Sequence, residues 1–445
     1  MKRILITFLF NILICKNLLA QEEPHRDSIS LKNDSLILID RTQQDSQMMT
    51  HAYSRSLPMS RNGSGTGWLP DASPMYMHLQ KNKRSNWMVH GNIVLRYNKQ
   101  DVFGKGSRGD AKIEVPNWFM GMYTRLIGAK GLVNITAMIS LDPLTVGEKG
   151  YPLLFQSGET YNGNRLVDRQ PPRDFISGLS VGYTHMFNKD VDLTAYFGYP
   201  GEPALGPVSY MKRISAFNNP DAVLGHHWQD SRHVVFGVGT LGLRIKKFKG
   251  EGSIFTGREP NENRYNLDQA RFDSYSYRLS YNPNPEWSFQ FSQGFIHEPE
   301  KLEPGQDVTR TSVSVMRSKS LRTINWSQSL IWGMNDKKFN LPREHTILYE
   351  NNLQFQSQAF YGRYEFIQKT PKDLGLDSVP VYTKYNIHAL TVGYNYNIAP
   401  AAPIEILLGF QTTLNFTDRL LKHLYGSAPL GLEIYLQLRP RKHQN

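Results

Sequence analysis

The chain has 445 residues, of which 40% are hydrophobic and 12% aromatic, and its 51 Lys and Arg against 39 Asp and Glu give a formal net charge of +12. Beyond residue 20 no apolar run approaches the roughly 18–20 residues of a membrane-spanning helix, and the aromatic content excludes a disordered or collagen-like chain. The basic residues are scattered without a nucleic-acid-binding motif, so we expect no nucleic-acid partner.

Residues 1–20 have the features of a secretory signal. Lys2 and Arg3 precede an apolar stretch from Ile4 to Cys15, and Ala20 offers a cleavage point. This order of charged, apolar and small residues is typical of a signal peptide and is too short for a stable anchor. We therefore predict export with a cleaved signal peptide, which would also remove the single cysteine of the chain.

Residues 21–86 form a second segment, polar at first and then rich in methionine and histidine. We expect a mostly irregular periplasmic or plug segment here. Thioether and imidazole groups are soft ligands suited to copper, in particular Cu(I) where thiols are absent. Alternatively, the methionines pack a plug or the first strand, where Met fills irregular gaps. The candidate metal ligands are Met48, Met49, His51, Met75, Met77 and His78.

From residue 87 to residue 439 the dominant hydrophobic period is two. In residues 275–281 and 404–411, for example, hydrophobic side chains alternate with small or polar ones. Such alternation predicts strands with one apolar and one polar face. Sixteen segments of this kind occur, at 87–97, 114–128, 131–141, 174–187, 191–199, 233–246, 248–257, 274–282, 286–296, 307–317, 320–332, 344–356, 358–368, 382–398, 404–416 and 428–438.

The connections between these segments alternate between short and long. Alternation of tight turns with long loops is the mark of a transmembrane barrel, and strands cross a bilayer only in a closed barrel. We therefore predict an all-β protein, a transmembrane antiparallel β-barrel of about 16 strands with 14 as the alternative count. We expect the protein to be located in the outer membrane, with the lipid bilayer and the barrel assembly machinery as partners. The alternative fold is a secreted two-sheet β protein whose apolar faces pack together.

The two longest connections, residues 142–173 and 200–232, are rich in proline and glycine. Long ordered loops on a rigid scaffold often carry function. Charged side chains in these loops could line a pore constriction, or they could hold the loops together through ion pairs. The residues concerned are Glu159, Asp168, Arg169, Asp174, Glu202 and Arg213.

A second candidate metal site lies at the end of the second long loop. His226, His227, Asp230 and His233 place three imidazoles and a carboxylate within eight residues, which is the ligand chemistry of a divalent ion. The alternative is that these side chains hydrogen-bond and stack to fold the loop, and Arg232 in their midst opposes a dense cation site.

Six distinctive motifs occur, at residues 140–144, 150–160, 168–170, 198–207, 226–228 and 257–260. They resemble those of an uncharacterised family of bacterial exported proteins, and the resemblance spans roughly residues 50–440. Members of that family are often encoded beside copper and heavy-metal efflux systems. The resemblance therefore implies copper or another divalent metal as a ligand, and metal ions or a periplasmic efflux component as partners. Relatives tend to carry histidine where this chain has Pro171, Arg173, Lys212 and Arg232, which argues against a complete metal cage in this member.

Three alternative functions are compatible with the predicted barrel. The first is a porin-like channel or a metal (copper) handling component of the outer membrane. The second is an outer-membrane hydrolase, which needs a Ser–His–Asp or Ser–His–Asn arrangement. The sequence has no Gly-x-Ser-x-Gly turn, so we assign no catalytic residue. The third is a surface binding or structural protein for which the barrel is an anchor.

Overall fold

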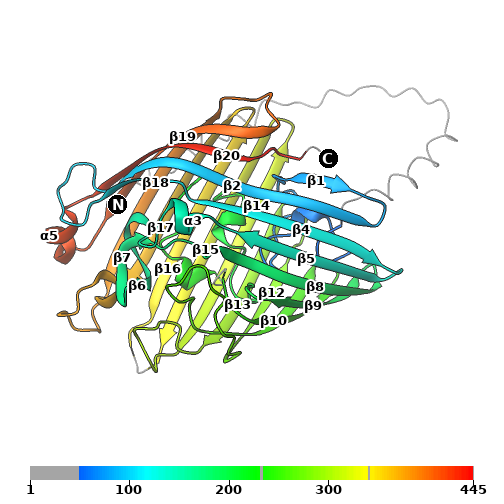
Figure 1. The fold of residues 1–445 in the computed structure, drawn as a ribbon, viewed down its shortest axis with the longest axis horizontal. Coiled ribbons are helices and arrows are strands. Elements are labelled where there is room, and N and C mark those ends of the chain that lie inside the picture. The colour runs from blue at the N-terminus through cyan, green and yellow to red at the C-terminus, as the bar shows by residue number, and fades with distance from the viewer. Residues whose placement is uncertain (1–49, 231–233, 339–340, 444–445) are drawn as a thin grey trace. The chain divides into compact units, whose positions relative to one another are not determined.

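The wall of the molecule is one closed antiparallel sheet (Figure 1). The computed structural model of the chain describes residues 50–230, 234–338 and 341–443, and they belong to the compact unit Met49–Asn445. The sheet has 18 strands, two of which, β1 (His78–Lys81) and β3 (Ala111–Glu114), are short additions beside β2. The remaining sixteen make up the wall: β2 (Ser85–Lys99), β4 (Asn117–Ile127), β5 (Gly131–Ile139), β8 (Ile176–Asn188), β9 (Val191–Gly198), β10 (Val238–Ile245), β11 (Phe248–Phe255), β12 (Ser274–Tyr281), β13 (Trp287–Ile296), β14 (Val308–Leu321), β15 (Ile324–Lys337), β16 (Glu344–Phe355), β17 (Gln358–Lys369), β18 (Tyr385–Asn397), β19 (Ile404–Phe416) and β20 (Leu430–Pro440).

The first and last wall strands pair and close the barrel. Ile93 of β2 stands opposite Asn117 of β4 on one side and opposite Leu438 of β20 on the other. Every other wall strand pairs with its neighbours in chain order. Closure leaves no unpaired sheet edge, which is the condition for strands to cross a bilayer. The prediction of an antiparallel barrel of sixteen strands is confirmed.

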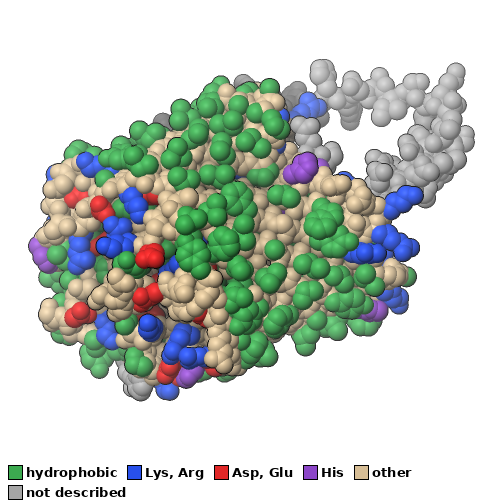
Figure 2. Space-filling model, in the orientation of Figure 1, with side chains coloured by type: hydrophobic (Ala, Val, Ile, Leu, Met, Phe, Trp, Pro, Cys, Tyr) green, Lys and Arg blue, Asp and Glu red, His purple; other side chains and the backbone are tan. Residues whose placement is uncertain are grey.

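The alternation in the sequence becomes an apolar outer face and a polar inner face. On β10, for example, Leu241, Leu243 and Ile245 are exposed, whereas Thr240 and Arg244 are buried. Hydrophobic side chains cover the side of the barrel, and charged side chains gather toward its ends (Figure 2). A soluble protein rarely exposes so large an apolar surface, and a band of this kind is the lipid-facing belt of a membrane barrel. No helix among the described residues is long and apolar enough to cross a membrane.

The remaining elements are short and lie in the connections. They include a two-stranded hairpin, β6 (Tyr151–Tyr161) and β7 (Asn164–Gln170), that is separate from the wall. The helices are η2 (Met59–Arg61), α3 (Asp142–Thr145), η3 (Tyr210–Lys212), α4 (His226–Gln229), η4 (Lys372–Leu374), η5 (Arg419–Leu421) and α5 (Lys422–Tyr425).

Several details differ from the sequence prediction, among them the short β1 and β3, which lie in segments predicted as irregular or as loop. The turn between β14 and β15 lies at residues 322–323 rather than 318–319, because the ladder continues beyond the apolar belt through polar pairs such as Ser320 and Asn325. The β6–β7 hairpin lies in what we predicted as loop. Its alternation is broken by register shifts, and Phe155 and Asp168 have positive φ angles of 67° and 57°, so the hairpin has no period-two signature.

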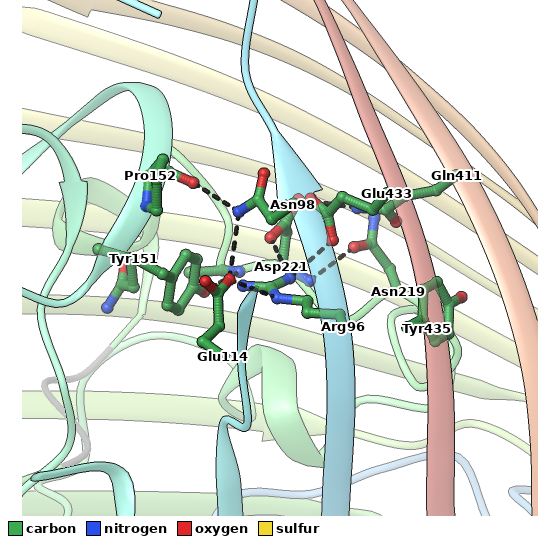
Figure 3. Close-up of polar contacts among 12 residues, drawn as sticks. Arg96, Asn98, Glu114, Tyr151, Pro152, Asn219, Asp221, Gln411, Glu433 and Tyr435 are labelled. Carbon is green, nitrogen blue, oxygen red and sulfur yellow. Dashed lines mark hydrogen bonds and ion pairs between the residues drawn. The ribbon is translucent and has the colours of Figure 1, made fainter. Parts of the chain in front are cut away.

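A buried arginine joins the elements at the closing seam (Figure 3). Arg96 of β2 forms ion pairs with Glu114 of β3 at 2.9 Å, Glu433 of β20 at 2.8 Å and Asp221 of the β9–β10 connection at 2.7 Å. Its guanidinium also lies 4.2 Å from the ring centre of Tyr151 in β6. One side chain therefore connects two wall strands, the short β3 and two inserted segments.

Replacement of Arg96 by Met should destabilise the barrel by about 3–5 kcal/mol, because it leaves three buried carboxyl groups without their cation. Chemical denaturation of the refolded protein in detergent measures the change. Arg125→Met is the matched control, since Arg125 is exposed on β4. Equal unfolding midpoints for the two variants would show that Arg96 does not hold the seam.

Candidate functional site

The interior of the barrel is the candidate functional site, and the chain itself occupies much of it. A barrel of sixteen strands is wide enough to leave an aqueous channel unless something fills it. Here three segments contact the inward face of the wall: residues 50–76, the β6–β7 hairpin and the described residues of the β9–β10 connection, 199–230 and 234–237.

Residues 50–76 bind the wall near its short turns. The backbone amide of Ala72 donates to the carbonyl of Pro285, in the short β12–β13 connection, at 2.8 Å. Further hydrogen bonds reach inward residues from β9 to β16, so this segment crosses the lumen as a plug. They join Ser54 to Asp192 (2.7 Å), Arg278 to Thr66 (2.9 Å), Asn282 to the carbonyl of Leu69 (2.8 Å) and Tyr76 to Gln354 (2.7 Å).

The β9–β10 connection folds into the lumen and contacts wall strands around it. Its central contact is Arg213, which is 1% exposed and donates two hydrogen bonds of 2.9 Å to Glu350 of β16. Because its partners come from β2, β13, β16 and β17, this insert is held on several sides. The other contacts are Gly206 with Ser292 (2.7 Å), Asn218 with Asn352 (2.8 Å), Asp221 with Arg96 (2.7 Å), Leu224 with Glu365 (2.7 Å) and Trp228 with Glu344 (2.7 Å).

The β6–β7 hairpin is the third insert. Lys369 of β17 donates to Ser157 at 2.8 Å, and the Phe155 ring packs 4.2 Å from the ring of Tyr425 in α5. The Tyr425 hydroxyl and the Phe155 amide both donate to Asp168, at 3.0 and 2.7 Å. Burial raises the pKa of Asp168 to about 6. This carboxyl group thus ties the hairpin to the β19–β20 connection.

The six charged residues predicted for the long loops are all in ion pairs. They lie in different parts of the inserts, and this distribution favours the interpretation that they hold the loops together. A role in lining a constriction stays a prediction. The pairs are Glu159 and Asp174 with Arg264, Asp168 with Arg108, Arg169 with Asp110, Glu202 with Lys212 and Arg213 with Glu350.

The described histidines of the second loop lie in α4, where His226 is buried and His227 is partly exposed. The rings of His226 and His227 lie 4.1 Å apart, and Nδ1 of His226 lies 2.6 Å from the carbonyl oxygen of Val223. Burial lowers the pKa of His226 to about 3 and raises that of Asp230 to about 8. Asp230 lies 3.9 Å from Arg213, a cation that opposes metal binding.

Metal binding by this cluster stays a prediction, because His233 lies outside the described residues. Within the described ranges, no group of three or more His, Cys, Asp or Glu side chains is arranged to hold a metal ion.

The predicted ligands of the N-terminal segment do not come together where they are described. His51 is 1% exposed and accepts a 2.9 Å hydrogen bond at Nδ1 from the amide of Tyr53. His78, by contrast, is exposed at the start of β1. Met77 is buried in the interior core and Met75 packs against that core, whereas Met48 and Met49 lie outside the described residues.

A different set of methionines is gathered on the inner wall, and our sequence reasoning missed it as a site. Met88 of β2, Met120 and Met122 of β4 and Met138 of β5 are all buried in the interior core. The spacing of Met120 and Met122 in the sequence could have indicated this set, because residues two apart share one face of a strand.

A cavity of about 300 Å³ opens among the long loops and is lined by residues 158–160, 256, 258–261, 268, 269, 271 and 300–302 with Arg165 and Phe236. A smaller cavity, about 40 Å³, lies against the inner wall and is lined by Met120, Met122 and Met138 together with plug and insert residues.

No protein-family model matches the chain, and comparison with curated proteins found no relative. Among solved structures, an anion-selective porin from Comamonas acidovorans is 10% identical with a TM-score of 0.49, over 80% of this chain and 99% of that one. OmpF of Salmonella typhi in complex with daunomycin is 9% identical with a TM-score of 0.49, over 81% and 100%. OpdK of Pseudomonas aeruginosa is 8% identical with a TM-score of 0.39, over 79% and 98%. Likeness at these levels says nothing of substrate or selectivity.

The inserted β9–β10 connection should be protected from trypsin in the folded barrel, because the side chain of Arg213 is 1% exposed and that of Lys212 is 14% exposed. We expect much faster cleavage after Lys301, whose side chain is 60% exposed in the β13–β14 connection. Mass spectrometry of the fragments over time measures the order. Cleavage after Arg213 as fast as after Lys301 would show that the connection leaves the lumen in solution.

Proposed function

We propose that this protein is an outer-membrane channel with a porin-like wall whose conduction is gated by its own inserted chain. The observation that supports this proposal is an apolar lipid-facing belt (Figure 2) around a lumen that three inserts cross. A general diffusion pore has no need of a lumen crossed by its own chain. An anchor for a surface protein has no need of a polar lumen in which inward charges such as Glu350, Glu365 and Lys369 have partners on the inserts.

The β9–β10 insert is the element best suited to gate the channel. It enters and leaves the wall between neighbouring strands and contacts the opposite side through hydrogen bonds and ion pairs rather than through a covalent link. Such contacts can be exchanged for water when the insert moves, so two positions of the insert can lie close in free energy.

A second candidate function, the handling of copper or another soft metal, is favoured by the methionines of the inner wall. Thioether sulfur is a ligand for soft ions, and four of these side chains lie together inside a barrel. The two functions are compatible, since an ion that crosses the membrane must pass this wall.

Replacement of Gly333 by Leu should increase conductance. Gly333 lies on β15, where an added Cβ would stand 2.2 Å from the carbonyl oxygen of Trp228, so a larger side chain displaces the insert from the wall. Single-channel recording of the refolded protein in planar bilayers measures the effect. We expect rare or small steps from the native protein and frequent larger steps from Gly333→Leu.

Gly121→Leu is the matched control, because Gly121 is exposed on β4 and an added Cβ meets nothing within 4 Å. Circular dichroism establishes that each variant is folded. A folded Gly333→Leu barrel as silent as the native protein would reject gating by the insert and favour the anchor interpretation.

A further inference from the structure

The inner wall carries a continuous methionine patch that spans three adjacent strands. Met88 stands directly opposite Met122 in the β2–β4 ladder, and Met120 stands directly opposite Met138 in the β4–β5 ladder. Directly opposed side chains have Cβ atoms about 4.5–5.5 Å apart, and Met120 and Met122 share one face of β4. The four thioethers are therefore neighbours on one inward surface.

A cavity of about 40 Å³ lies over this patch. Its wall side is formed by Met120, Met122 and Met138, and its lumen side by Tyr53 of the plug and by Glu202 and Lys212 of the β9–β10 insert. This volume is in the range that holds a single water molecule or ion. Three flexible thioether side chains can thus reach a common point in a confined space.

The sulfur atoms of the patch are not engaged elsewhere. Another buried methionine, Met211, accepts a hydrogen bond at Sδ from Arg173 Nε at 2.9 Å. Among the described residues no hydrogen bond goes to Sδ of Met88, Met120, Met122 or Met138, so their lone pairs are available to a ligand.

A histidine stands at the edge of the patch. His90 of β2 lies directly opposite Met120, and its Nε2 atom is shielded from solvent without a hydrogen-bond partner among the described residues. A buried polar atom without a partner is costly and calls for an explanation. An imidazole nitrogen of this kind is a ready ligand for a copper-group ion.

The charges around the cavity select the class of ion. Lys212 and Glu202 both line it and form an ion pair at 3.5 Å, so the cavity has no net anionic charge to offer. Hard divalent ions require carboxylate or carbonyl oxygen, whereas thioether sulfur favours soft ions such as Cu(I). Neutral sulfur ligands without an added carboxylate suit a soft monovalent cation.

We propose that Met88, Met120, Met122 and Met138, with His90 at their edge, form a binding site on the inner wall for a soft monovalent cation, Cu(I) or its analogue Ag(I). The inference deepens the metal-handling candidate and rests on that proposed function, but it requires no open channel.

Titration of the refolded full chain with Ag(I) tests the proposal, with calorimetry for affinity and NMR of ¹³C-methyl methionine for location. We expect tight Ag(I) binding that shifts the methyl signals of the patch. Met120→Leu/Met122→Leu/Met138→Leu should remove that binding while the barrel stays folded, because Leu conserves the volume of Met. In a competition with a Cu(I) chelator, the native protein should likewise bind Cu(I) more tightly than the triple Leu variant.

Two control variants test whether Ag(I) binding is specific to the methionine patch. Met316→Leu changes a methionine that is also buried but packs with Leu69 and Val208 away from the patch, and it should bind Ag(I) as the native protein does. His226→Ala/His227→Ala should likewise leave the binding unchanged. The proposal is wrong if the folded native protein binds no Ag(I), or if the triple Leu variant retains native affinity. Neither outcome bears on gating, which the conductance of Gly333→Leu measures independently.

Discussion

The buried inward charges of this barrel need partners, which come both from neighbouring wall strands and from the inserted segments, and the rest of this structure follows from that constraint. Arg96 shows it most clearly. Its three carboxylate partners come from the neighbouring β3 and β20 and from the β9–β10 insert. The same insert supplies Arg213 to Glu350 across the lumen. Because a buried charge without a partner is costly, the wall and its inserts stabilise each other.

Local periodicity determined how much of the fold could be predicted. The sixteen wall strands were predictable because each must present one face to lipid and one to the lumen. This requirement makes hydrophobic residues recur at every second position of a strand. The direction of the long loops was not predictable. A proline-rich segment can lie over the mouth or enter the lumen, and the choice depends on contacts such as Arg213 with Glu350, which are 137 residues apart in the chain.

The candidate site was predicted less well than the fold, for a related reason. Sequence reasoning looked for ligands that are close in the chain, such as His226 and His227. The methionines of the patch come from three strands, and only the ladder register places Met88 beside Met122 and Met120 beside Met138. Met is also a common filler of irregular cores, so its presence on a strand does not by itself indicate a ligand.

The gate and the proposed ion site share one element. Glu202 and Lys212 belong to the β9–β10 insert, and they close the cavity over Met120, Met122 and Met138. If the insert leaves the wall, the cavity loses the part of its lumen side that Glu202 and Lys212 form, while Tyr53 of the plug remains beside the methionines. A ligand that binds one position of the insert more tightly than the other must shift the equilibrium between them, and the position of the insert must change the affinity by the same factor. If both proposals hold, ion occupancy and conduction in this barrel are coupled through the β9–β10 insert, and the sign of the coupling depends on which position of the insert gives the thioethers the better geometry.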